Sequence, residues 1–307
     1  MGALHEGHLS LIRQAARENT DVFVSIYVNP TQFGVNEDLS SYPRTWDSDV
    51  EKLEVLNKEL ADVNQERPGR ITAIFAPTSK TMYPTLPPSS EIDGEGSFVT
   101  ITPLSKKLEG ASRPVFFRGV ATVCMKLFNA TTPDRVYFGQ KDVQQTVIIK
   151  RMVQDFLLGT EVRIAPTARE PDGLAMSSRN VYLGDRRRSV GLTLHRALSA
   201  AEEAYKAGKT TRADILGVAR AITDRVAAEQ QALSPTERAL FETDYISLAD
   251  PETLDELELV DLSKGAVLSG ALKMAPLEDS QAGEDCGLGE GKVPVRLIDN
   301  IILPPRI

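Results

Sequence analysis

Residues 135–165 read RVYFGQKDVQQTVIIKRMVQDFLLGTEVRIA, and this stretch decides the fold. A short apolar run, Val136–Phe138, precedes the polar turn Gly139-Gln140-Lys141-Asp142. Apolar residues then recur at helical spacing over Gln144–Phe156, and Glu161–Ala165 is a second β-rich run. Two strands joined through a helix lie parallel in one sheet. The stretch therefore predicts a parallel sheet covered by helices.

The same alternation of helices and strands extends toward the N-terminus. It predicts helices over Leu9–Arg17, Asp47–Leu60 and Phe117–Asn129, and strands over Val22–Val28, Ile71–Phe75 and Phe98–Ile101. Such alternation is typical of an α/β, Rossmann-like domain.

The pattern changes after about residue 167. It predicts one long helix over Arg186–Ala207, another over Arg212–Gln231, and strands over Asp244–Leu248, Leu257–Leu262, Gly265–Leu272 and Val293–Ile302. We therefore expect a Rossmann-like domain over residues 1–167 and a smaller C-terminal α+β domain over 168–307. Residues 57–70 and 276–292 look like insertions, and we expect the second to be a mobile surface loop.

Composition restricts the class of protein. The chain has 307 residues, of which 41% are hydrophobic and 25% charged, and a net charge of −8. This acidic balance argues against a general nucleic-acid or membrane-surface binder, which usually has a basic face. Cys124 and Cys286 have no metal-binding spacing, so we expect free thiols in a reducing compartment.

The first eight residues, MGALHEGH, contain His5 and His8 directly before the first predicted helix. A helix N-terminus attracts phosphate, and two imidazoles placed there can donate hydrogen bonds to phosphate oxygens. Capping or an incidental surface position are the simpler interpretations. A metal site is less favoured because no third ligand is evident.

Three further polar stretches are candidates for binding. Ser177, Ser178 and Arg179 suit the β- and γ-phosphates of ATP, although a plain polar turn has the same composition. Lys141 lies in a strand-to-helix turn, where ligands of parallel sheets collect. Gln32, which follows a strand, and Gln145 can grip a hydroxy-acid, although a lone glutamine is usually a surface residue.

Taken together, these motifs resemble the adenylate-forming nucleotidylyltransferases, whose "HIGH" and "KMSKS" signatures correspond to the histidine and Met-Ser-Ser-Arg elements. Within that superfamily the chain resembles the pantothenate synthetase family. The strings that carry the resemblance, in order, are MGALHEGHLSL, YVNPTQF, YPRT, LEGASRP, FRGVATVC, PDRVYFGQKDVQQ, PTAREPDGLAMSSRN and RLIDNI.

The resemblance implies a cytoplasmic homodimer that uses ATP and Mg²⁺ to join (R)-pantoate to β-alanine through pantoyl adenylate, releasing AMP and pyrophosphate. The C-terminal domain would be a lid. His8 would be the proton donor, and His5, Lys141, Ser177, Ser178 and Arg179 would stabilise charge. ATP would contact Met1, Gly2, Ala3, Leu4, His5, Glu6, Gly7, His8, Gly139, Gln140, Lys141, Asp142, Ala168, Met176, Ser177, Ser178 and Arg179.

For the other substrates, the resemblance implies that Gln32 and Gln145 hold pantoate and that Gln32 also lies near β-alanine. Arg113 would help to close the site. Asn29, Tyr42, Asp47 and Asp49 are weaker candidates near the substrate or its metal.

The chain departs from the family pattern in two places. The family has a strand and a Pro-Thr pair before the residue that matches Met1. That strand is central in a parallel sheet, so its absence would leave unpaired strand edges and an open apolar groove. A misassigned start or a truncation would explain the difference, and in either case we expect this polypeptide to fold poorly. Val115-Phe116 also stands where the family has Gly-His, so either Arg113 or Arg118 takes over that histidine's role or the histidine is dispensable.

Three other functions remain open: another small-molecule nucleotidylyltransferase, a relative of aminoacyl-tRNA synthetases, and an inactive paralogue. The acidic charge argues against the second. The intact His5, His8 and Lys141 argue against the third, and the missing strand argues for it.

Overall fold

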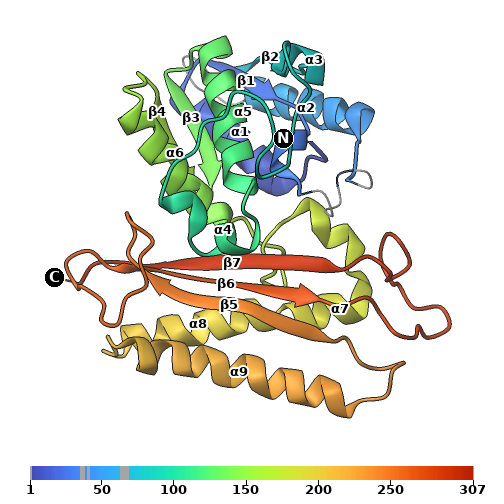
Figure 1. Ribbon diagram of the computed structural model, residues 1–307. Helices are drawn as coiled ribbons and strands as arrows, with labels where there is room; N and C mark the ends of the chain where they lie inside the picture. The colour runs from blue at the N-terminus through green and yellow to red at the C-terminus, as the bar shows by residue number, and fades with distance from the viewer. Residues whose placement is uncertain (1, 35–38, 40–41, 63–68, 307) are drawn as a thin grey trace. The chain divides into compact units, whose positions relative to one another are not determined.

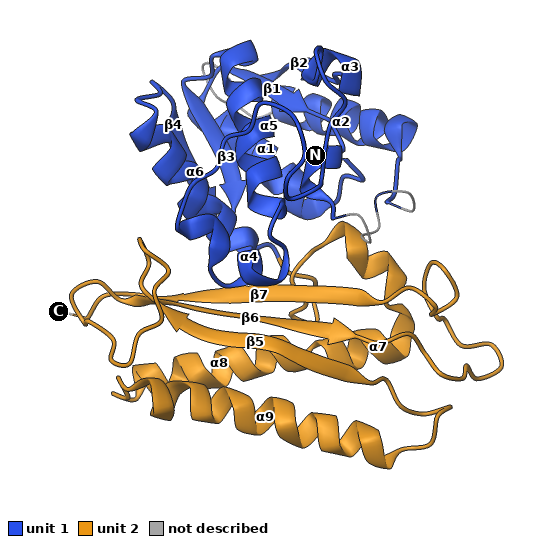
Figure 2. Cartoon of the chain, in the orientation of Figure 1, with its two compact units in different colours: residues 1–168 blue, residues 169–307 orange. Residues whose placement is uncertain are grey.

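The computed structural model describes residues 2–34, 39, 42–62 and 69–306. The chain divides into two compact units, Met1–Ala168 and Arg169–Ile307 (Figure 2). The division falls one residue from the predicted boundary. The roles assigned to the two parts stay predictions.

The first unit alternates helices and strands (Figure 1). Its elements are α1 (Glu6–Glu18), β1 (Asp21–Ser25), η1 (Pro30–Gln32), α2 (Trp46–Ala61), β2 (Arg70–Phe75), α3 (Ser79–Met82), η2 (Leu104–Lys106), α4 (Glu109–Ser112), α5 (Phe116–Thr131), β3 (Arg135–Gly139), η3 (Gln140–Asp142), α6 (Val143–Asp155) and β4 (Glu161–Ala165).

The strands of this unit pair in parallel, as the sequence predicts. β1 pairs with β2, from Asp21 opposite Arg70 to Ser25 opposite Phe75, and β3 pairs with β4. Two expectations were wrong in detail. First, β1 ends at Ser25, so residues 26–28 lie beyond the strand. Second, residues 98–101 form no strand, because the Val99 N–H donates to the side chain of Thr122 on α5 instead of to a neighbouring strand.

The core of the first unit lies where α1 and α2 cover β1. Ile12, Ala15 and Ala16 of α1 pack on alternate residues of the strand, Val22 and Val24. Helical spacing on one element and alternation on the other produce this contact, since each presents one apolar face.

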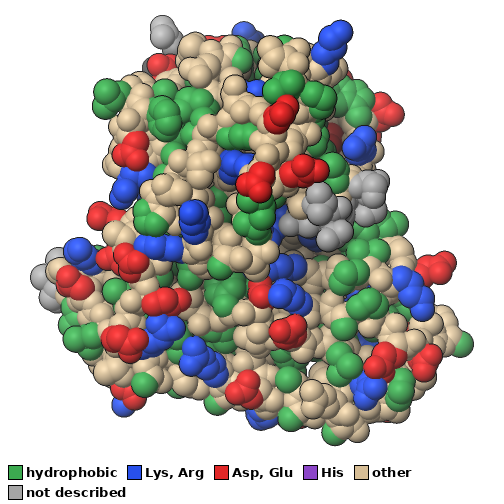
Figure 3. Space-filling view, viewed as in Figure 1, with side chains coloured by type: hydrophobic (Ala, Val, Ile, Leu, Met, Phe, Trp, Pro, Cys, Tyr) green, Lys and Arg blue, Asp and Glu red, His purple; other side chains and the backbone are tan. Residues whose placement is uncertain are grey.

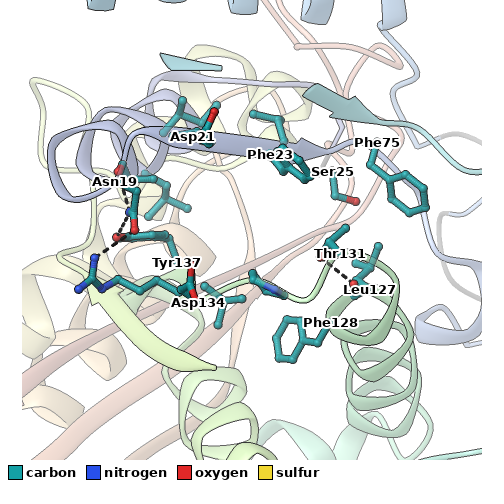
Figure 4. A pocket seen from close by; sticks show the side chains of 18 of the residues that line it. Asn19, Asp21, Phe23, Ser25, Phe75, Leu127, Phe128, Thr131, Asp134 and Tyr137 are labelled. Carbon is teal, nitrogen blue, oxygen red and sulfur yellow. Dashed lines mark hydrogen bonds between the residues drawn. The ribbon is translucent and has the colours of Figure 1, made fainter. Parts of the chain in front are cut away.

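A groove of about 490 Å³ lies between β1 and β3 (Figure 4). Phe23 and Ser25 lie on its β1 side, while Tyr137 of β3 and Leu127 and Phe128 of α5 lie on the opposite side. Among the described residues, β1 pairs only with β2 and β3 only with β4. The facing edges of β1 and β3 are therefore unpaired, as the departure from the family pattern predicted.

The second unit places two helices on an antiparallel sheet. It contains η4 (Ser178–Tyr182), α7 (Gly184–Gly191), α8 (Thr193–Lys206), α9 (Arg212–Ala232), β5 (Phe241–Ala249), β6 (Ala266–Met274) and β7 (Val295–Leu303), with the strands in the order β5-β6-β7. Leu194, Ala197, Leu198, Ala201 and Tyr205 form the buried stripe of α8, which packs on Leu248 and Leu268 of the sheet. The predicted fold class, a parallel α/β part followed by a smaller α+β part, is confirmed.

Three details of the second unit differ from prediction. The long helix is interrupted at Leu192, directly after Gly191, a residue with low helix propensity. Residues 257–262 form no strand, because only Leu259 makes an isolated bridge, to Thr211. Residues 276–292 lack regular structure but are held by α7, where Arg186 pairs with Glu284.

Across the residues that the structure describes, no helix is both long and apolar enough to cross a bilayer. Basic and acidic side chains are mixed over the face drawn in Figure 3. Cys124 and Cys286 are both free thiols, as expected.

Candidate functional site

The two N-terminal histidines cap α1. The backbone N–H of Gly7 donates to His5 Nδ1 at 3.2 Å, and the N–H of His5 donates to His8 Nδ1 at 3.4 Å. The helix thus begins at Glu6 rather than after His8, and His8 lies in its first turn. The histidines therefore have the capping role that the sequence left open. Because both Nδ1 atoms accept hydrogen bonds, each neutral ring carries its proton on Nε2.

Both histidines are neutral at pH 7. Burial, together with the charges of Lys141 and Lys52, lowers the pKa of His5 to about 4. Burial and the neighbouring His5 lower the pKa of His8 to about 2. The ring centroids are 4.0 Å apart. The pair therefore offers two neutral Nε2–H donors beside a helix N-terminus and a lysine, a set that suits an anion.

A buried carboxylate orders the loop before α1. Asp49, which is 1% exposed, accepts the N–H of Ala3 at 2.9 Å and of Leu4 at 2.7 Å. Lys52, one turn along α2, donates to the carbonyl of Leu4 at 2.7 Å. Ala3 has φ of 50°, an uncommon conformation that these bonds hold in place. The sequence suggested Asp49 and Asp47 as weaker candidates near the substrate or its metal, and that role stays a prediction. Besides the two backbone N–H groups, Asp49 accepts the hydroxyl of Thr45 at 3.1 Å, whereas Asp47, in the same turn, is exposed.

A second buried network orients Gln32. Asn29, 2% exposed, donates to Gln32 Oε1 at 3.2 Å and to the Gly119 carbonyl at 3.1 Å, and Tyr83 donates to Asn29 Oδ1 at 2.6 Å. Tyr83 was missed by sequence reasoning, because it lies 54 residues from Asn29 and no local pattern marks it. Tyr42 packs edge-on against Phe33, next to Gln32.

Arg113 lies close to Gln32. Its guanidinium pairs with Glu109 at 2.9 Å and stacks 3.8 Å from the ring centroid of Phe116. Phe116 thus supports Arg113 at the position where the family pattern has a histidine. Arg118 is engaged elsewhere, since it donates to the Ile92 carbonyl at 2.7 Å.

The turn after β3 carries Lys141, whose amino group lies 3.7 Å from Asp142. Gln145, on the first turn of α6, is partly exposed. Its neighbour Gln144 is buried instead and donates to the carbonyls of Leu104 and Lys107. Two adjacent glutamines therefore differ in environment, which sequence alone could not resolve, and the role of Gln145 in binding stays a prediction.

The Met-Ser-Ser-Arg element lies in the second unit. Ser177 caps η4 and accepts the N–H of Arg179 at 3.3 Å, and Asn180 donates to the Ala175 carbonyl at 3.1 Å. Residues Met176 to Asn180 are all partly exposed. The other predicted ATP contacts lie in the first unit. Gly2 is buried, whereas Glu6 is exposed and pairs with Arg13. Gln140 lies in η3, Ala168 is the last residue of the unit, and Met1 lies outside the described residues.

A pocket of about 370 Å³ connects several of these features within the first unit. Its lining includes Gly2, Ala3, Val28, Pro30 and Asp49. A hollow of this size suits a small metabolite.

Comparison with known proteins points to one family. A family model described as pantoate-beta-alanine ligase matches residues 1–302. A pantothenate synthetase of Roseiflexus castenholzii is 46% identical over 260 residues, which is 85% of this chain and 82% of that protein.

Solved structures agree. The pantothenate synthetase of Thermus thermophilus superposes with a TM-score of 0.76 at 35% identity, covering 99% of this chain and 91% of that one. The pantoate-beta-alanine ligase of Francisella tularensis, complexed with beta-gamma ATP and beta-alanine, gives a TM-score of 0.66 at 28% identity, covering 98% and 87%.

Proposed function

This chain belongs to the pantoate-beta-alanine ligase family, and from that premise we propose how its residues perform the reaction. It is an AMP-forming ligase that joins pantoate to β-alanine at the expense of ATP, yielding pantothenate. One observation supports the placement of the chemistry above all others: two neutral histidines whose Nε2–H groups are left to donate at the start of α1, in the electrostatic range of Lys141.

In the first step, a pantoate carboxylate oxygen attacks the α-phosphorus of ATP, and the bond to pyrophosphate breaks. Negative charge grows on the phosphoryl oxygens. His5 and His8 donate hydrogen bonds to them, and Lys141 supplies a positive charge. Because the pKa of His8 is about 2, we propose that it acts as a neutral hydrogen-bond donor and not as an imidazolium acid.

In the second step, the neutral β-alanine amine attacks the acyl carbon of pantoyl adenylate, AMP leaves with the former carboxylate oxygen, and the nitrogen releases one proton to water. Gln32, oriented by Asn29, and Gln145 bind pantoate, while Arg113 helps to close the site. In the first step, Ser177, Ser178 and Arg179 bind the β- and γ-phosphates, which leave as pyrophosphate. No protein nucleophile is needed, so the residues position reactants and stabilise charge.

Mg²⁺ would neutralise charge on the ATP phosphates. The described residues contain no group of three or more His, Cys, Asp or Glu side chains that could hold a metal ion. This fits an ion that arrives with ATP and is held mainly by phosphate oxygens and water, as Mg²⁺ commonly is. We also propose that the enzyme works as a cytoplasmic homodimer, which sedimentation at micromolar concentration tests.

The reaction is tested by incubating the chain with ATP, Mg²⁺, D-pantoate and labelled pyrophosphate. Label should enter ATP only when pantoate is present, and β-alanine should then convert the mixture to pantothenate and AMP. His8→Ala should slow exchange about 100-fold or more, since it removes one preorganised donor. If the exchange of pyrophosphate into ATP depended on a phosphorylated alcohol instead of on pantoate, the chain would have another nucleotidylyltransferase activity.

A further inference from the structure

A partly buried ion pair in the second unit joins the polypeptide before the Met-Ser-Ser-Arg element to the sheet. Arg169 donates from Nη1 to Asp299 Oδ2 at 2.7 Å and from Nη2 to Asp299 Oδ1 at 2.9 Å. Asp299 lies on β7 and its side chain is 4% exposed. Two parallel hydrogen bonds fix the orientation as well as the distance of the arginine, which a lysine cannot do.

Arg169 also begins a tight hairpin. It forms a bridge with Ala175, and the Glu170 N–H donates to the Leu174 carbonyl at 2.8 Å. The guanidinium itself reaches the hairpin's tip, where Nη1 donates to the Gly173 carbonyl at 3.1 Å. One side chain thus connects Asp299, on the sheet, with the tip of residues 169–175.

The tip rests on the third histidine of the chain. Gly173 has φ of +97°, and a Cβ placed there would lie 2.9 Å from His195 Cδ2 on α8. His195 Nδ1 is 3.6 Å from Asp299 Oδ2, beyond hydrogen-bond distance. On the outer side, Arg188 of α7 donates to Asp172 at 2.8 Å. The hairpin is therefore held against three elements, α7, α8 and β7.

The hairpin continues directly into the phosphate-binding residues that we propose. Asn180 reaches back to the Ala175 carbonyl, and Ser177 caps the turn that contains Ser178 and Arg179. Movement of the hairpin must therefore carry the two serines and the arginine with it.

We propose that Arg169 and Asp299 are positioning residues that hold Met176–Arg179 in the geometry required for the phosphates of ATP. The proposal rests on the proposed function of that element. Neither residue needs to contact ATP. Fixing the loop before ATP arrives reduces the ordering that binding must otherwise impose.

The test compares Asp299→Asn and Arg169→Lys with a matched control, Asp244→Asn. Asp244 lies on β5 of the same sheet, is 10% exposed, and pairs with Arg296 at 2.8 Å and with Lys273 at 2.6 Å. It is a carboxylate with cationic partners on the same sheet, although less buried than Asp299, and its bonds lead to β6 and β7 and not to the hairpin.

Three quantities are measured for each variant: KM for ATP in pantoate-dependent exchange, the Kd of ATP by calorimetry, and deuterium uptake of residues 170–180. Both hairpin variants should raise KM and Kd for ATP about tenfold, change KM for pantoate less than about twofold, and speed uptake over 170–180. Asp244→Asn should lower the melting temperature without these effects.

Equal Kd values for ATP in the hairpin variants and in Asp244→Asn would overturn the proposal, whether or not uptake changes. If Asp299→Asn fails to fold, Arg169→Lys, which keeps the charge, decides the matter. An enzyme that binds ATP but lacks pantoate-dependent exchange would contradict the proposed function, and the Kd comparison would still judge the positioning role.

Discussion

At the scale of single residues, the buried histidines of α1 link the site to stability. Their folded-state pKa values, about 4 for His5 and about 2 for His8, lie below the ordinary 6.5. Below pH 6.5 these histidines are therefore protonated in the unfolded chain but stay neutral in the folded chain. The free energy of unfolding must then fall as the pH falls toward these folded-state values.

We expect the free energy of unfolding, and with it the urea midpoint, to decrease between about pH 7 and about pH 5.5. The free energy should fall by up to about 1.4 kcal/mol per pH unit for each histidine that stays neutral. His8→Gln removes one of the two groups and should flatten the slope. Urea unfolding at both pH values measures this, and equal slopes for the two proteins would show that His8 is not buried in the neutral form.

Two aspartates in the first turn of α2 make a sharper comparison. Asp49→Asn removes one of the two oxygens that accept the N–H groups of Ala3 and Leu4, and should lower stability by about 1–3 kcal/mol and slow pyrophosphate exchange. Asp47→Asn, at an exposed position, should change stability by less than about 0.5 kcal/mol. Chemical denaturation of both variants tests the difference, and equal losses would mean that the loop does not depend on Asp49.

Single residues also mark the limit of prediction from sequence. The run Arg186-Arg187-Arg188 has uniform chemistry, but each arginine has a different environment. Arg186 pairs with Glu284, Arg188 pairs with Asp172, and Arg187 is fully buried and donates to carbonyls, including that of Val293 at 2.6 Å. These partners are distant in sequence, and no periodicity encodes them. The histidine and Met-Ser-Ser-Arg elements could be singled out from the sequence because each is a local pattern, and their roles in the reaction stay predictions.

At the scale of secondary-structure elements, close packing of α5 against η1 positions Gln32. A Cβ on Gly119 would lie 2.3 Å from the Thr31 carbonyl oxygen and 2.6 Å from the Gln32 nitrogen. The glycine therefore permits the helix to approach the turn, and Asn29 bonds to its carbonyl at the same contact. Periodicity predicted α5 to within two residues at each end, but not what it approaches.

Gly119→Ala should displace η1, lower stability by about 1–3 kcal/mol and raise KM for pantoate more than KM for ATP. The matched control is Gly217→Ala in α9, where an added Cβ meets nothing within 4 Å. That substitution should instead raise stability by about 0.5–1 kcal/mol, because alanine favours a helix. Thermal melts and steady-state kinetics separate the two, and an unchanged KM for pantoate in Gly119→Ala would dissociate η1 from that substrate.

At the scale of the whole molecule, the groove between β1 and β3 is a feature of the first unit that the comparison with the family pattern predicted, although no local periodicity encodes it. α1 packs against both strands, with Ile12 and Ala15 near Val22, Val24 and Tyr137. Phe23, on the groove, is 58% exposed. Parallel strands joined by a helix follow a right-handed crossover, so a strand entering α1 from upstream would lie beside β1, within this groove.

We therefore expect that five β-branched apolar residues, fused upstream of residue 1 through a short linker, raise the melting temperature by about 5 °C or more. Such a strand would pair with the unpaired edges of β1 and β3 and cover exposed apolar side chains such as Phe23. A Gly/Ser segment of equal length is the control, because it adds chain without burying side chains. If both fusions have the same melting temperature as the chain without a fusion, the two sheet edges are stable without a partner strand. The groove must then be attributed to the packing of α1 and α5. If only the apolar fusion gains stability and faster exchange, the sheet on which the histidine turn is built limits activity as well as folding.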